Sequence, residues 1–202
     1  MSSLLIEEKS PEEEFAVTTS KRSMLVVPPT QVLHSGNLFE ISIHRPNASL
    51  RREVDIFLKA VIASGSLGNT GNVLIIATCQ RAKVDLLQWN EDSAVEKDRL
   101  LRTFQALAQD LCEYLKRSGY WADFADPASG LLSNSPGHII WPEVQVLERL
   151  RGYKLSRAGP CHILLHPVWG SRMYPATIFT NAPEAEVKAK LGLLYEDARF
   201  GK

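Results

Sequence analysis

Apolar and polar residues alternate along the chain in ways that predict both strands and helices. Phe39, Ile41 and Ile43 alternate with polar side chains, and this period of two is typical of a half-buried strand. Residues 73–78 form a continuous apolar, β-rich run, which favours a buried central strand. Shorter strands are predicted at residues 121–124, 161–166 and 176–180. We expect the last two of these strands to pair with each other.

The longest helix is predicted after Asn90, where apolar residues recur every three or four positions as far as Gly119. Its apolar stripe consists of Leu100, Phe104, Leu107, Leu111 and Leu115. Ser93 and Glu96 have the spacing of a capping box, and Gly119 is a natural C-terminal stop. Other helices are predicted over residues 50–61, 144–150 and 184–194. Ser49 is the expected N-cap of the first of them.

Strands mixed with helices predict an α+β sandwich that forms a single domain over residues 37–202. Residues 1–36 contain a run of glutamates and the Pro28-Pro29 pair, with few apolar side chains that could fill a core. A segment of this composition buries too little apolar surface to offset the entropy of ordering it. We therefore expect a disordered acidic N-terminal tail.

Charge and composition narrow the class of protein. The 202 residues include 23 Lys and Arg against 23 Asp and Glu, a balance that gives no electrostatic reason to expect nucleic acid or an anionic membrane as a partner. No apolar run reaches the roughly 18 residues of a membrane span. Early acidic residues such as Glu7 and Glu8 argue against a mitochondrial transit peptide. Cys79, Cys112 and Cys161 fit neither a disulfide framework nor a zinc site, so a reducing, cytoplasmic setting is expected.

Two motifs offer candidate chemistry. The glycine-rich segment 65–71 fits neither the P-loop nor the dinucleotide fingerprint, so a flexible loop is predicted there. On a strand, His162 and His166 share one face and Cys161 points to the other, which rules out a local Cys-His nucleophilic pair. The two histidines could join a metal site, but no third ligand is identifiable. Residue type alone favours a buried structural role for Cys161.

Three segments resemble signatures of the methylmalonic aciduria and homocystinuria type D protein family, which handles cobalamin. They are Gly119–Gly130 (GYWADFADPASG), His166–Gly170 (HPVWG) and Ile178–Ala182 (IFTNA), in the family's order and at similar spacing. The resemblance covers most of residues 50–192, and the twelve-residue segment is its most specific part. It implies a nitroreductase-like α/β sandwich whose mixed or antiparallel sheet is flanked by helices.

The resemblance also implies a function, which is that of a cobalamin-trafficking adaptor or chaperone rather than an enzyme. Members of the family form a heterodimer with the type C cobalamin-processing protein. They help to route the cofactor to methionine synthase in the cytosol or to methylmalonyl-CoA mutase in the mitochondrion. The N-terminal region of the family carries the mitochondrial role, and the folded C-terminal domain serves the cytosolic one.

Cys161 becomes the candidate cobalt ligand through this resemblance. In the family, two cysteines follow a glycine and the first thiolate ligates cobalt while cobalamin sits in the partner. Thiolate is a soft ligand that suits a polarizable metal centre. Here the corresponding residues are Gly159, Pro160 and Cys161, so only the second cysteine remains. A shift of one residue on a regular strand turns the thiol to the opposite face. A bulge or a strand start at Pro160 would return the thiol to the face that the family's first cysteine occupies. Tight cobalamin binding by the chain alone is not expected.

A small flavin-dependent reductase of the nitroreductase kind is the alternative function. Flavin sites need several cationic or amide donors around the phosphate and the ring, and no such constellation is visible in the sequence.

Overall fold

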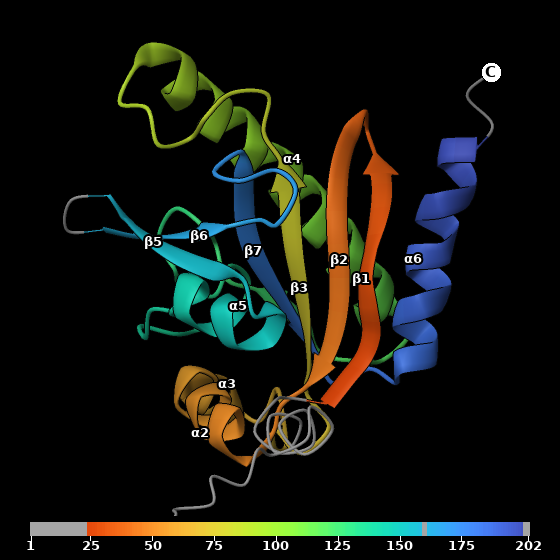
Figure 1. Cartoon of the computed structure of the whole chain (residues 1–202). Coiled ribbons are helices and arrows are strands. Elements are labelled where there is room, and N and C mark those ends of the chain that lie inside the picture. The colour runs from red at the N-terminus through yellow and green to blue at the C-terminus, as the bar shows by residue number, and fades with distance from the viewer. Residues whose placement is uncertain (1–23, 159–160, 200–202) are drawn as a thin grey trace, which may run out of the picture.

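The computed structural model describes residues 24–158 and 161–199, which form an antiparallel sheet flanked by helices (Figure 1). The strands are β1 Met24–His34, β2 Asn37–Arg45, β3 Leu74–Arg81, β4 Ala122–Phe124, β5 Lys154–Ala158, β6 Cys161–Leu165 and β7 Met173–Thr180. The helices are α2 Ala48–Phe57, α3 Lys59–Ala63, α4 Glu91–Arg117, α5 Glu143–Arg151 and α6 Glu184–Arg199. The predicted α+β class is confirmed. Within the described ranges, none of the helices is long and apolar enough to cross a bilayer.

Five strands form the main sheet in the order β1-β2-β3-β7-β4, and each neighbouring pair is antiparallel. β3 lies at the centre because its continuous apolar run can be buried on both faces, and every residue of it except Arg81 is buried. The register places Ile76 between Ile43 of β2 and Ile178 of β7. A separate two-stranded sheet consists of β5 and β6.

The two faces of the main sheet bury different apolar clusters. Helices α4 and α6 cover one face, while α2, α3, α5 and the β5–β6 hairpin lie on the other (Figure 1). Phe104 and Leu107 of α4 share the first cluster with Ile76. Ile75 and Phe179 belong to the second cluster, on the opposite face. Consecutive residues of β3 therefore serve two cores, because successive side chains of a strand point to opposite faces.

β2 is buried on both faces, whereas its alternating pattern predicts a half-buried strand. Its polar residues Glu40, Ser42 and His44 are only 9%, 0% and 1% exposed. They have polar partners in the interior: Ser42 Oγ lies 2.6 Å from His44 Nε2, and Glu40 accepts from two side chains described below. Burial of a polar strand face is tolerated when hydrogen bonds replace those lost to water.

Asparagines cap the two helices for which the sequence suggested serine caps. Asn90 Oδ1 accepts a hydrogen bond from the backbone N–H of Ser93 at 2.9 Å, so the predicted capping box of Ser93 and Glu96 is wrong. Asn47, rather than Ser49, caps α2 in the same way. Serine and asparagine are comparably good N-cap residues, so composition alone does not decide between neighbours.

The expected pairing of the strands at 161–166 and 176–180 is wrong. β6 pairs with β5, which the sequence analysis missed, whereas β7 lies between β3 and β4. Only two residues of the sequence separate β5 from β6, a spacing that suits antiparallel neighbours. β7 instead lies inside the main sheet, between β3 and β4, and its last five residues are all buried.

The predicted disordered tail is wrong for residues 24–34, which form β1 at the edge of the main sheet. Its pairing with β2 shifts register around Pro28 and Pro29, which have no N–H to donate. Proline is tolerated on an edge strand because one side of the strand needs no sheet partner. Val32 is 2% exposed, and α6 contacts β1 on the sheet face. Residues 1–23 lie outside the described part of the chain.

A chain that begins at residue 35 is expected to be less stable than one that begins at residue 24. It lacks the buried Val32 side chain, and burial of a valine contributes about 1.5 to 3 kcal/mol to the free energy of unfolding. Urea denaturation of the two truncated chains measures the difference. Equal midpoints would show that β1 adds nothing to the fold.

Candidate functional site

Cys161 lies at the start of β6, in the hairpin that β6 forms with β5. Its Cα pairs with that of Ala158, and the register continues to Lys154 opposite Leu165. Figure 1 shows this hairpin beside α5, extending away from the main sheet. Residues 159–160, including Pro160, lie outside the described residues, as does the side chain of Cys161. The structure thus fixes the backbone position of Cys161 at the start of β6, opposite Ala158 at the end of β5.

The other two cysteines are buried structural thiols. Cys79 and Cys112 are each 0% exposed and are free of disulfides. Burial raises the pKa of the Cys79 thiol to about 12, and burial also raises the pKa of Cys112 to about 12. Since the thiolate is the form that binds metals, neither of these side chains can act as an accessible ligand.

The two histidines of the predicted strand lie in different surroundings. His162 is exposed and lies opposite Arg157 of β5. His166 follows the end of β6, is 3% exposed and forms a bridge with Gly170. The structure therefore does not bring the two together as a metal site. Over the described ranges, no group of three or more His, Cys, Asp or Glu side chains is placed to hold a metal ion.

A buried ionic cluster ties the base of the hairpin to the main sheet, and its centre is Glu40 of β2. Arg151 Nη1 donates to Glu40 Oε1 at 2.7 Å, and the Tyr153 hydroxyl donates to the same oxygen. Arg151 Nη2 also donates to the backbone oxygens of Ala77 and Glu40, at 3.0 and 3.2 Å. The Arg151 side chain is only 1% exposed, so the pair is shielded from water. All four contacts connect the segment just before β5 to the main sheet, three of them to β2 and one to β3.

His166 anchors the other end of the hairpin as a neutral imidazole. Its Nδ1 accepts backbone N–H groups from Val168 and Trp169, at 3.1 Å each, so Nδ1 carries no proton and Nε2 does. Nε2 lies 3.3 Å from Glu40 Oε1, a contact too poorly aligned for a full hydrogen bond. Burial lowers the pKa of His166, and the ring stacks on Trp169 with centroids 4.0 Å apart.

The residues of the signature segments have structural roles, because their side chains form hydrogen bonds with backbone groups. Thr180 Oγ1 donates to the backbone oxygen of Trp121 at 2.8 Å, and Asn181 Oδ1 accepts from its N–H at 2.8 Å. The buried Asp123 accepts from the N–H groups of Phe124 and Asn134, at 2.8 and 3.0 Å. Two of the three signatures therefore join β4 to the end of β7, and the third is the His166 turn. None of these contacts forms a catalytic arrangement.

The glycine-rich segment is a loop between α3 and β3, as predicted, and contacts within it and to α2 hold it in place. Arg51 of α2 donates to the backbone oxygen of Gly71 at 2.9 Å, and Thr70 donates to Asp55. Asn69 Oδ1 accepts from the N–H of Gly71, and a Cβ at Gly71 would lie 2.8 Å from that oxygen. These contacts give the segment a structural role.

Glu40, Arg151 and Tyr153 support the site but were not predicted from the sequence. Glu40 lies between the apolar residues Phe39 and Ile41, a spacing that predicts a solvent-facing side chain, and Arg151 lies in the last turn of α5, where basic residues are common. Arg151-Gly152-Tyr153 carried no usable signal, because the strand that follows it and its pairing with the Cys161 strand were not predicted. The ionic partner, 111 residues away in sequence, had no local signal.

The described chain is thus an α+β domain with a cysteine-bearing hairpin that is anchored on one face of an antiparallel sheet. The family model of the methylmalonic aciduria and homocystinuria type D protein matches residues 7–191. The chain belongs to this family.

Curated relatives agree with this assignment. The chain is similar to the cobalamin trafficking protein CblD of Homo sapiens, with 34% identity over 124 residues. It is also similar to the CblD proteins of Rattus norvegicus, with 34% identity over 112 residues, and of Gallus gallus, with 32% over 126. The alignment with the human protein covers 60% of this chain and 42% of that protein. The chain therefore spans less than half the length of this relative.

Proposed function

We propose that this chain is a cobalamin-trafficking adaptor that works in complex with a type C cobalamin-processing protein. The observation that carries the proposal is family membership over residues 7–191, together with relatives named as cobalamin trafficking proteins. The destinations we propose for the cofactor are methionine synthase and methylmalonyl-CoA mutase. In this role the chain catalyses no reaction of its own, and a cytoplasmic setting remains a prediction.

Cys161 is the residue that we propose as a ligand to cobalt when the partner presents cobalamin. The thiol loses its proton to solvent as the sulfur–cobalt bond forms, and the soft thiolate suits the metal. Cys161 is the remaining choice because Cys79 and Cys112 are buried and their thiol pKa values are raised. The Glu40 cluster supports the proposal, since Arg151 and Tyr153 hold the segment before β5 on β2 of the main sheet.

Cys161→Ser tests the assignment in a mixture with cobalamin-loaded type C protein. We expect the variant to fold and to form the complex, because serine is nearly the same size as cysteine. The thiolate-dependent change in the cobalt absorption spectrum should be lost, because a serine hydroxyl stays protonated and is a hard donor. Gel filtration reports complex formation, and visible absorption reports cobalt ligation.

Cys112→Ala is the matched control, because it also removes one thiol but from a buried position. It should keep the spectral change in full. Retention of the change in Cys161→Ser contradicts the ligand assignment alone, whereas failure of the unmodified chain to form the complex contradicts the adaptor function. Yellow flavin absorbance of the purified chain would favour the alternative function, which is that of a small flavin-dependent reductase with a nitroreductase-like α/β sandwich.

A further inference from the structure

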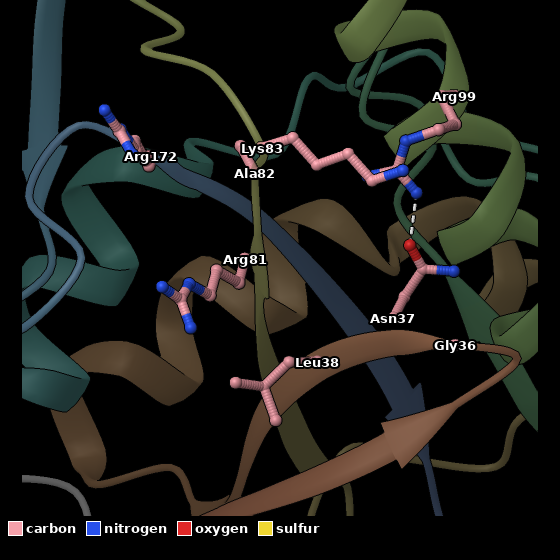
Figure 2. A pocket seen from close by; sticks show the side chains of 8 residues that line it. All are labelled: Gly36, Asn37, Leu38, Arg81, Ala82, Lys83, Arg99 and Arg172. Atoms are coloured by element: carbon pink, nitrogen blue, oxygen red, sulfur yellow. Dashed lines mark hydrogen bonds between the residues drawn. The ribbon is translucent and has the colours of Figure 1, made fainter.

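A basic cavity of about 340 Å³ lies at the end of the main sheet that is farthest from α2 and α3. Four cationic residues line it: Arg81 at the end of β3, Lys83 in the following loop, Arg99 of α4, and Arg172 before β7. Asn37 at the start of β2 completes the wall. Figure 2 shows Arg99 and Asn37 joined on one side of the cavity, with Arg81 and Arg172 on the other. These segments are far apart in sequence, so no local pattern predicted the cavity.

The cations of the cavity are only partly neutralised. Among the side chains that the structure describes, no carboxylate oxygen lies within 4.0 Å of the charged nitrogens of Arg81, Lys83 or Arg172. Two carboxylates lie near: Glu96 pairs with Arg99, and the charge of Arg172 contributes to lowering the pKa of Asp85, after hydrogen bonds from Leu87 and Ser171. Four cations against two carboxylates leave the concave surface with a positive field that attracts anions.

Arg99 is held in a fixed orientation before any ligand arrives. Its Nε and Nη2 donate to Glu96 at 2.7 and 2.8 Å, and its Nη1 donates to Asn37 Oδ1. Glu96 also accepts the backbone N–H of Lys83 at 2.7 Å, so the same carboxylate links α4 to the loop after β3. These contacts use three of the five guanidinium N–H donors, and no side chain of the described part of the chain takes the other two.

We propose that this cavity binds the phosphate group of a small phosphorylated molecule. Arginine forks match the geometry of phosphate oxygens, and a fixed guanidinium loses little entropy when it binds. The volume is at the lower end of the range for small-molecule sites, which suits a phosphate with a small organic group. The neutral charge balance of the chain argues against a nucleic-acid strand as the ligand. The site is independent of Cys161 and of the adaptor function proposed above.

Titration of the full chain with inorganic phosphate and with adenosine monophosphate tests this proposal, without cobalamin or any partner. Ionic strength is kept constant with sodium chloride. We expect saturable shifts of the backbone amide resonances of Asn37, Lys83 and Arg172, and a dissociation constant that calorimetry can confirm. Tighter binding of the nucleotide identifies an organic phosphate as the ligand, and equal affinities show that the phosphate alone is recognised.

Arg81→Gln and Arg172→Gln should each weaken phosphate binding about tenfold, the usual effect of one charged hydrogen bond. Both side chains are exposed, so the variants should keep the melting temperature of the unmodified chain. Arg117→Gln is the matched control, because it removes the same charge at the opposite end of α4, where the side chain is 79% exposed. The absence of saturable binding overturns the proposal, and so does an equal loss of affinity in Arg117→Gln.

Discussion

Replacement of Arg151 by methionine is expected to lower the free energy of unfolding by about 3 to 5 kcal/mol, the usual result of removing one partner of a buried ion pair. Methionine fills much of the space of the arginine stem but leaves the carboxylate of Glu40 buried without a cation. The backbone oxygen of Ala77 loses a donor in the same change. The loss of stability should be greatest in the region around Arg151, between β2 and the start of the hairpin.

Urea denaturation gives the global effect of Arg151→Met, and hydrogen exchange gives its location. Amides of β5 and β6 should exchange faster relative to those of β3, because the hairpin loses its anchor while the sheet centre keeps its packing. Arg149→Met is the matched control: its pair with Glu53 has side chains 43% and 34% exposed, and pairs of this kind contribute about 0 to 1 kcal/mol.

The double variant Arg151→Met with Glu40→Gln separates an unpaired charge from lost packing. It should recover part of the stability lost in Arg151→Met, since no buried charge remains without a partner. If Arg151→Met and Arg149→Met have the same denaturation midpoint, the buried cluster does not hold the hairpin.

Periodicity predicted the elements whose apolar residues are buried in an unbroken pattern. The apolar run of β3 and the stripe of α4 were readable from sequence because burial is repeated along their whole length. β1 was missed because Leu25 and Leu33 are 50% and 48% exposed and two prolines interrupt it. Its order depends on β2 and α6, which a local pattern does not contain.

The candidate site was predictable only where the sequence resembles a known family. Cys161 was found through the family's pattern of a glycine followed by two cysteines, and the structure adds the hairpin register that places its backbone. The supports of the hairpin could not be predicted, because Glu40 meets Arg151 through the tertiary fold alone. The basic cavity is a similar case, since Arg81 and Arg172 come together only when β3 and β7 pair.

Leu107→Ala is expected to destabilise the domain by about 2 to 5 kcal/mol, the range for a large-to-small change in a core. Leu107 is 1% exposed and shares its apolar cluster with Phe104, Ile76 and Ile178, so α4 presents this side chain to the centre of the main sheet. Truncation removes the transfer energy of the buried methyl groups and leaves a cavity that close-packed neighbours fill only in part.

Val95→Ala on the same helix provides the control, because Val95 is 63% exposed and alanine has the higher helix propensity. The control should leave the urea midpoint unchanged or raise it slightly, while Leu107→Ala lowers it with little change in the slope of the transition. If Leu107→Ala does not change the urea midpoint, α4 packs a different face against the sheet. Since the stripe that includes Leu107 was predicted from spacing alone, this variant tests the sequence pattern and the packing of α4 together.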